Sequence, residues 1–125
     1  MINKFFLGTA QFGLDYGIAN TRGKIKGKMA SEILASAFSE GINNIDTAIE
    51  YGNSENFLGS YGMKDWNVVT KIPTIPKNTT NISDFLFAQI EGSLSRLKID
   101  QFHGILIHNV EQFISNSLFT EQIFN

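Results

Sequence analysis

The sequence predicts a parallel α/β fold, and three observations lead to this prediction. Short apolar segments alternate with longer segments of helical period four times along the 125 residues. The helical segments are long enough to return the chain to the start of a parallel neighbour. Apolar runs such as residues 68–69 and 105–107 suit strands that are buried on both faces. Right-handed crossovers then give either an open α/β sheet or a segment of a barrel.

The four predicted strands share an apolar and partly β-branched composition, which is typical of strands. They are Phe5–Thr9, Ile42–Thr47, Trp66–Ile72 and Gly104–His108. Glycines follow the first strand and Pro73 follows the third, so turn signals bound the strands. The sequence therefore predicts strands that are short and regularly interrupted.

The predicted helices carry apolar residues at helical spacing. The clearest spans roughly Ser83–Lys98, with a stripe formed by Leu86, Ile90, Leu94 and Leu97. An earlier helix is expected to end at Gly41, because glycine readily adopts the left-handed conformation of a helix stop. A short helix has Ser54 as its candidate cap and Gly59 as its candidate end. A last helix is expected within residues 110–125.

Composition excludes several classes of protein. Hydrophobic residues make up 42% and charged residues 18% of the chain, as in ordinary globular domains. A net charge of −2 gives no reason to expect binding to nucleic acid or to an anionic membrane. The absence of cysteine excludes disulfides and thiol catalysis. The apolar run at Phe5–Leu7 is too short for a signal peptide or a membrane span. We therefore expect one cytoplasmic domain over residues 1–125.

Ionisable side chains stand at or just beyond three successive strand ends. Asp46 and Tyr51 follow the second strand, Lys71 lies near the end of the third, and His108 ends the fourth. Because the carboxyl ends of parallel strands meet on one face, we expect these side chains to converge. Each has an ordinary alternative: a capping carboxylate, a packing tyrosine, a surface lysine or a core histidine. The recurrence at three strand ends favours a shared site.

The four side chains suit proton transfer to a carbonyl oxygen. A phenol has a pKa of about 10 and is a poor acid at neutral pH, but a neighbouring ammonium stabilises the phenolate. A carboxylate beside the ammonium would hold it in place and keep it charged. Asp46 and Lys71 would then make Tyr51 a usable general acid. His108, if neutral, would donate a hydrogen bond to a substrate oxygen while a hydride reaches the carbon.

Five segments, in order along the chain, resemble the aldo-keto reductases. They are FLGTAQFG, GINNIDTAIEYGNSENFLG, WNVVTKI, SLSRLKID and ILIH, and they lie between residues 5 and 108. The second is the most specific of them. The resemblance implies a (β/α)8 barrel and an NAD(P)H-dependent oxidoreductase, usually using NADPH, that reduces an aldehyde or ketone to an alcohol.

The resemblance also implies roles for individual residues. The implied catalytic residues are Asp46, Tyr51, Lys71 and His108. The implied cofactor-binding residues, near the nicotinamide end of NADP(H), are Gly8, Thr9, Ala10 and Asp46. Tyr51 would be the proton donor, Lys71 its partner and Asp46 the support of Lys71. His108 would orient the carbonyl of a small substrate.

The length of the chain departs from the family. A (β/α)8 barrel takes roughly 250 residues, and four strand–helix units are about half of one. No G-x-G-x-x-G or P-loop pattern replaces the missing phosphate-binding loops. A half-barrel leaves two sheet edges unpaired and an apolar face exposed. We therefore expect a truncated chain of little or no activity, a self-associating chain, or a chain that pairs with a second half-barrel.

Two alternatives stay open. The first is a non-catalytic remnant or interaction module built on a half-barrel. The second is a metal-dependent α/β-barrel hydrolase that uses Asp46 and His108. A catalytic zinc site takes three protein ligands, whereas no H-x-H or H-E-x-x-H pattern occurs and His103 is the only other histidine. The sequence therefore predicts no metal site.

Overall fold

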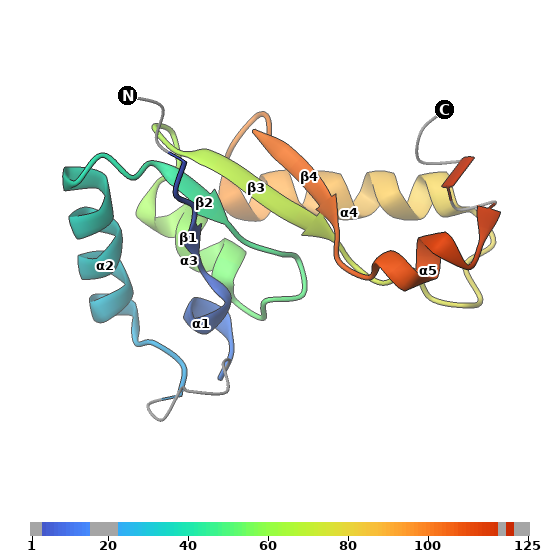
Figure 1. Ribbon diagram of the computed structural model, residues 1–125, viewed down its shortest axis with the longest axis horizontal. Coiled ribbons are helices and arrows are strands. Elements are labelled where there is room, and N and C mark those ends of the chain that lie inside the picture. Colours follow the sequence, from blue (N-terminus) through green and yellow to red (C-terminus); the bar gives the residue numbers. More distant parts are fainter. Residues whose placement is uncertain (1–3, 16–22, 118–119, 122–125) are drawn as a thin grey trace.

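The computed structural model describes residues 4–15, 23–117 and 120–121, which form a four-stranded sheet with helices (Figure 1). The strands are β1 (Leu7–Gly8), β2 (Asn44–Asp46), β3 (Asn67–Ile72) and β4 (Gly104–Ile107). The helices are α1 (Ala10–Gly13), α2 (Gly27–Ser39), α3 (Ser54–Tyr61), α4 (Ile82–Leu97) and α5 (Val110–Ile114). Each strand is followed by a helix, as the alternating pattern predicts.

The order of the strands decides between an open sheet and a barrel segment. Each strand is parallel to the next one in sequence, in the order β1-β2-β3-β4. A doubly wound sheet reverses its direction of growth, whereas a barrel adds every new strand on the same side. Figure 1 shows α3 and α4 together behind the strands. The fold is therefore a segment of a (β/α) barrel, as the resemblance implies.

The register of the sheet sets which side chains share a face. Gly8 pairs with Asp46, and Asp46 pairs with Val69. Lys71 lies on the same face as Val69 and Asp46, because side chains alternate along a strand and Lys71 is two positions further on. Leu106 pairs with Lys71 and lies on this face as well. We call this side of the sheet the inner face.

The main core lies on the opposite face, between the sheet and the helices. Ile45 and Val68 pack there in one cluster with leucines of α2, α3 and α4, all at most 2% exposed. These leucines are Leu34, Leu58 and Leu97. Burial of such a side chain contributes about 1.5–3 kcal/mol. The apolar stripes of the helices therefore fix the helices to the sheet.

Two predictions about α3 need correction. Asn53, and not Ser54, occupies the N-cap position, and Ser54 Oγ donates instead to the Thr9 carbonyl oxygen at 3.0 Å. Gly59 does not end the helix, which continues beyond it. A Cβ at Gly59 would lie 2.0 Å from the Arg96 carbonyl oxygen, so glycine is required there for close packing on α4. Ser54 and Gly59 therefore serve contacts with other parts of the chain, and not the local capping and helix-ending roles that their positions predict.

The prediction that β4 is buried on both faces is wrong for the described chain. Ile105 is 40% and Leu106 48% exposed, whereas Val68 and Val69 of β3 are buried as expected. Among the described strands β4 pairs only with β3, so one edge and part of its surface face solvent. Exposed apolar side chains on an edge strand are typical of a surface that another element covers.

Other local features bear on the remaining predictions. Gly41 has a φ of 80° and ends α2 as predicted. The helix predicted over residues 110–125 begins as α5, and part of that range lies outside the described residues.

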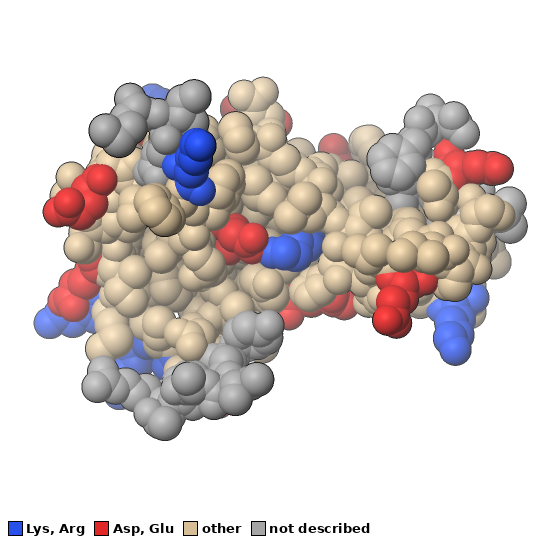
Figure 2. Space-filling model, in the orientation of Figure 1, with Lys and Arg blue, Asp and Glu red and all other residues tan. Residues whose placement is uncertain are grey.

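No described helix has the length and apolar character that crossing a membrane requires. Figure 2 shows acidic and basic side chains interspersed on one face of the molecule, without a patch of single sign.

Candidate active site

The structure brings the four strand-end residues together at the carboxyl edge of the sheet. Lys71 Nζ forms an ion pair with Asp46 Oδ1 and also donates to the Thr47 carbonyl oxygen at 3.1 Å. The same Nζ lies 5.0 Å from the centroid of the Tyr51 ring. The Tyr51 ring meets the His108 ring edge to face, with 5.7 Å between centroids. Tyr51 therefore contacts both of its predicted partners.

The ion pair is only partly buried. The side chain of Lys71 is 16% exposed and that of Asp46 is 36% exposed. The position of Asp46 is fixed from the other side by Thr9, whose backbone N and Oγ1 both donate to the Asp46 carbonyl oxygen at 3.0 Å. The sheet thus fixes the backbone of Asp46, and the Asp46 carboxylate pairs with the ammonium that lies beside the phenol ring.

Backbone contacts fix the loop that carries Tyr51. Its N–H donates to the Ala48 carbonyl oxygen and its own carbonyl oxygen accepts from Ser54 N–H, both at 3.1 Å. A Cβ at Gly13 would lie 1.6 Å from the Tyr51 carbonyl oxygen, so only glycine permits this crossing of two chain segments. Gly52 lies against Gly13 and has a φ of 55°, which also favours glycine. The glycines after the first strand predict a turn at Gly13 but not this close crossing.

A second group of polar residues lies beneath this loop and was not predicted. Ser54 Oγ donates to the Thr9 carbonyl oxygen and lies 3.1 Å from Thr9 Oγ1 and 3.3 Å from Thr47 Oγ1. All three side chains are fully buried. Their hydrogen bonds join the ends of β1 and β2 to the first turn of α3. The hydroxyl residues in T-A-Q and Y-G-N-S-E were the available signal.

Glu55 is a buried carboxylate that no sequence pattern singled out. It is 2% exposed and accepts hydrogen bonds from Thr70 Oγ1 at 2.8 Å and Ser93 Oγ at 2.6 Å. Its other oxygen accepts from Arg96 Nε at 2.8 Å. Thr70 immediately precedes Lys71 on β3. Glu55 therefore ties α3 and α4 to the part of the sheet that carries the candidate site.

Glu50 is a further residue at the site that sequence reasoning did not select. Its Oε2 lies 3.1 Å from His108 Nδ1, and both side chains are partly exposed. The site thus contains two pairs of an acidic and a basic side chain, Asp46 with Lys71 and Glu50 with His108. The only feature of the sequence that could have pointed to Glu50 is its position directly before Tyr51.

The predicted cofactor-binding residues lie close together but differ in exposure. Gly8 is exposed on the inner face next to Asp46, and nothing lies within 4 Å of where its Cβ would be. Ala10 is half-buried at the start of α1. Thr9 is completely buried, with its hydroxyl bonded to Asp46. Gly8 and Asp46 therefore border open space, whereas the Thr9 side chain serves to position Asp46.

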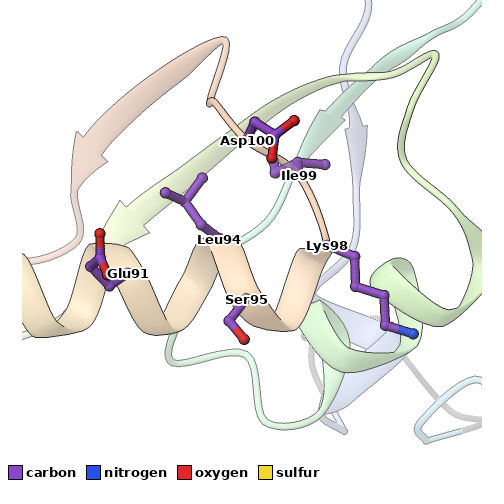
Figure 3. Close-up of a pocket in the computed structure, with 6 residues that line it drawn as sticks. All are labelled: Glu91, Leu94, Ser95, Lys98, Ile99 and Asp100. Carbon is purple, nitrogen blue, oxygen red and sulfur yellow. The ribbon is translucent and has the colours of Figure 1, made fainter.

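A separate surface hollow lies at the other end of the sheet. Figure 3 shows residues from the last turns of α4 and from the turn that leads into β4. They are Glu91, Leu94, Ser95, Lys98, Ile99 and Asp100. None of the four strand-end residues lines this hollow. Over residues 4–15, 23–117 and 120–121, no group of three or more His, Cys, Asp or Glu side chains is placed to hold a metal ion.

Comparison with known protein families agrees with this geometry. The model of the aldo/keto reductase family matches residues 4–120. The chain belongs to the aldo/keto reductase family. No curated protein matches it.

Solved structures of aldo-keto reductases share the fold. A candidate aldo-keto reductase of Pseudomonas aeruginosa is 29% identical with a TM-score of 0.71, over 94% of this chain and 48% of that one. An aldo-keto reductase of Bacillus halodurans in its holo form is 18% identical with a TM-score of 0.63, over 95% of this chain and 43% of that one. The second likeness shows the fold alone. The chain therefore spans about half the length of these relatives, that is, half of a (β/α)8 barrel.

Proposed function

We propose that this chain supplies the proton-donating half of an NAD(P)H-dependent reductase that converts an aldehyde or ketone to an alcohol. The observation that carries the proposal is the contact of the Tyr51 ring with both the Lys71 ammonium and the His108 imidazole. No metal is required, because the phenol, and not a Lewis acid, activates the carbonyl.

Each residue has one task in the proposed reaction. The substrate carbonyl oxygen lies between Tyr51 and His108, which orient it by hydrogen bonds. The O–H bond of Tyr51 breaks as its proton passes to this oxygen, and Lys71 stabilises the phenolate that is left. Asp46 holds Lys71 in place. Solvent then returns a proton to Tyr51.

The chain has residues for the nicotinamide end of the cofactor but no loop for the cofactor phosphates. When bound, NAD(P)H supplies the hydride that forms the new C–H bond at the carbonyl carbon, so that the carbonyl is reduced and the dihydronicotinamide oxidised. Gly8 and Asp46 border open space on the inner face and would lie beside the nicotinamide. No glycine-rich phosphate loop follows any strand of the sequence. The cofactor phosphates therefore need residues from elsewhere.

We further propose that a second α/β segment covers the open edge of β4 and completes the barrel. Ile105 and Leu106 on β4 are about half exposed, and the matched relatives are about twice as long as this chain. A second copy of the chain fits less well, because it would duplicate the proton-transfer residues and still lack phosphate-binding loops. Association of the purified chain with itself would favour the second copy instead.

A chimeric enzyme tests the proposed reaction. Residues 4–120 replace the matching half of the Pseudomonas aeruginosa relative, which supplies the second half of the barrel. We expect this chimera to oxidise NADPH in the presence of small aldehydes. Tyr51→Phe should lower kcat/KM by at least about 100-fold. Tyr61→Phe is the matched control, since Tyr61 lies at the end of α3 and outside the site.

Two results would contradict the proposal. One is a folded chimera that reduces none of the aldehydes or ketones tried, and the other is full turnover by the Tyr51→Phe chimera. The isolated 125-residue chain should bind NADPH only weakly in a fluorescence titration. Micromolar affinity would show that the phosphates find their partners within this half.

A role as an interaction module is the second candidate function. It is favoured by the exposed apolar side chains of β4, which suit the binding of another protein without any chemistry. The chimera separates the two roles. A binding module would assemble with the second half and protect β4, but Tyr51→Phe would then change nothing that can be measured.

A further inference from the structure

We infer that Glu50 determines which nitrogen of His108 carries a proton, so that His108 donates to the substrate oxygen only as a charged imidazolium. The catalytic part of this inference rests on the proposed function. The protonation of the ring is a property of the chain itself and is independent of turnover.

The contact between Glu50 and His108 constrains the protonation of the imidazole ring. His108 Nδ1 lies 3.1 Å from Glu50 Oε2, which is hydrogen-bond distance. An ionised carboxylate can only accept hydrogen bonds, so the proton of this bond belongs to Nδ1. A neutral imidazole carries a single N–H. As long as Glu50 is bound, neutral His108 therefore has a bare lone pair at Nε2.

This assignment changes what His108 can do. A carbonyl oxygen is an acceptor, and an acceptor cannot bond to a bare Nε2. The sequence predicted that a neutral His108 donates to the substrate. A neutral His108 that donates from Nε2 carries no proton on Nδ1, so its hydrogen bond to Glu50 would be lost. With both nitrogens protonated, Nδ1 bonds Glu50 and Nε2 donates to the substrate. Glu50 is thus a positioning residue that acts through His108.

The neighbouring charged groups decide whether an imidazolium at His108 would have a counterion. The ionisable side chains that contact His108 in the described part of the chain are Glu50 and Tyr51, both from the loop after β2, and Lys71 of β3 contacts Tyr51 in turn. Lys71 has its own counterion in Asp46. Glu50 is therefore the carboxylate available to balance an imidazolium. A charged donor forms a stronger hydrogen bond to the oxygen as negative charge develops there during reduction.

Nuclear magnetic resonance on the full chain tests this inference. Long-range ¹H–¹⁵N spectra of histidine-labelled protein report which ring nitrogen is protonated, and the chain has only two histidines. His103→Gln assigns the signals, and His103 in the unmodified chain is an internal reference. At a pH at which the ring of His108 is neutral, we expect its proton on Nδ1. Glu50→Leu, whose side chain can neither accept nor donate a hydrogen bond, should shift the population toward the Nε2–H form by about fivefold or more.

The control is Glu111→Gln, which removes an exposed carboxylate from nearby α5 and should leave the signals of His108 unchanged. A neutral His108 that carries its proton on Nε2 in the unmodified chain would overturn the inference. An unchanged population in Glu50→Leu would do the same. None of these spectra depends on activity, so an inactive chimera would count against the proposed function and not against the role of Glu50.

Discussion

The carboxylate of Glu55 on α3 and the guanidinium of Arg96 on α4 form a salt bridge behind the sheet, with 2.8 Å between Oε2 and Nε. Glu55 is 2% and Arg96 32% exposed, so the acidic partner is the buried one. Thr70 and Ser93 occupy the other oxygen of Glu55. Three elements of the chain, α3, α4 and β3, therefore meet at one carboxylate that has no part in the proposed chemistry.

Glu55→Gln should destabilise the fold by roughly 2–4 kcal/mol. The amide nitrogen of glutamine would face Arg96 Nε as a second donor, and one buried hydrogen bond would be lost. Urea unfolding followed by circular dichroism measures the change as a lower midpoint at constant slope. Glu32→Gln on the exposed side of α2 is the control and should stay within about 0.5 kcal/mol. Equal midpoints for the two variants would show that the buried carboxylate contributes little.

Gly13→Ala should displace the Tyr51 loop. The new Cβ would lie 1.6 Å from the Tyr51 carbonyl oxygen, so the loop or α1 must move. We expect a loss of about 1–3 kcal/mol and a weaker contact between the rings of Tyr51 and His108. Unfolding midpoints and the nuclear Overhauser effect between the two rings measure these changes. Gly8→Ala is the control, because nothing lies within 4 Å of its Cβ position; a ring contact that survives Gly13→Ala would contradict the close crossing.

Lys71→Met should separate activity from stability. The ion pair with Asp46 is partly exposed, so its loss should cost no more than about 1 kcal/mol of folding free energy. In the chimera, however, kcat/KM should fall by at least about 100-fold, because the phenolate of Tyr51 loses its neighbouring charge. Steady-state kinetics and thermal unfolding of the same preparation give both values. Lys64→Met, on an exposed turn, should alter neither; a Lys71→Met chimera that retains most of its activity would remove Lys71 from the proton-transfer chain.

Leu106→Ser tests whether β4 is covered in the complete protein. In the isolated chain Leu106 is 48% exposed, and its truncation should cost about 1 kcal/mol. In the chimera the second half of the barrel would bury this side chain, and the same substitution should cost roughly 2–4 kcal/mol. The comparison of urea midpoints in the two backgrounds is the measurement. Equal losses would mean that nothing packs on this position.

The sequence predicted the elements and the central residues of the site because both follow from local patterns. Alternation of strands and helices predicts parallel strands, and parallel strands place their carboxyl ends at one edge. Asp46, Lys71 and His108 could therefore be brought together without knowledge of any distance. Strand order also followed, once the resemblance to a barrel was recognised.

The side-chain partners could not be predicted in this way. The bond between Glu50 and His108 depends on the path of the loop after β2, and the contacts of Glu55 depend on how α3 docks on α4. Ser54 and Gly59 carried real signals, but a serine near a helix start and a glycine near its end have local explanations that compete with tertiary ones. Only the packed structure distinguishes these explanations.

The sequential strand order has a consequence for biosynthesis. Each described strand after β1 finds a hydrogen-bonding neighbour in the strand made just before it. A polypeptide leaving the ribosome can thus lengthen the sheet one unit at a time, without waiting for distant sequence, in keeping with the amino-terminal-first folding of growing chains. The strand made last therefore has an unpaired edge at each stage, and among the described strands this is β4, whose open edge can pair with a later segment or with another molecule.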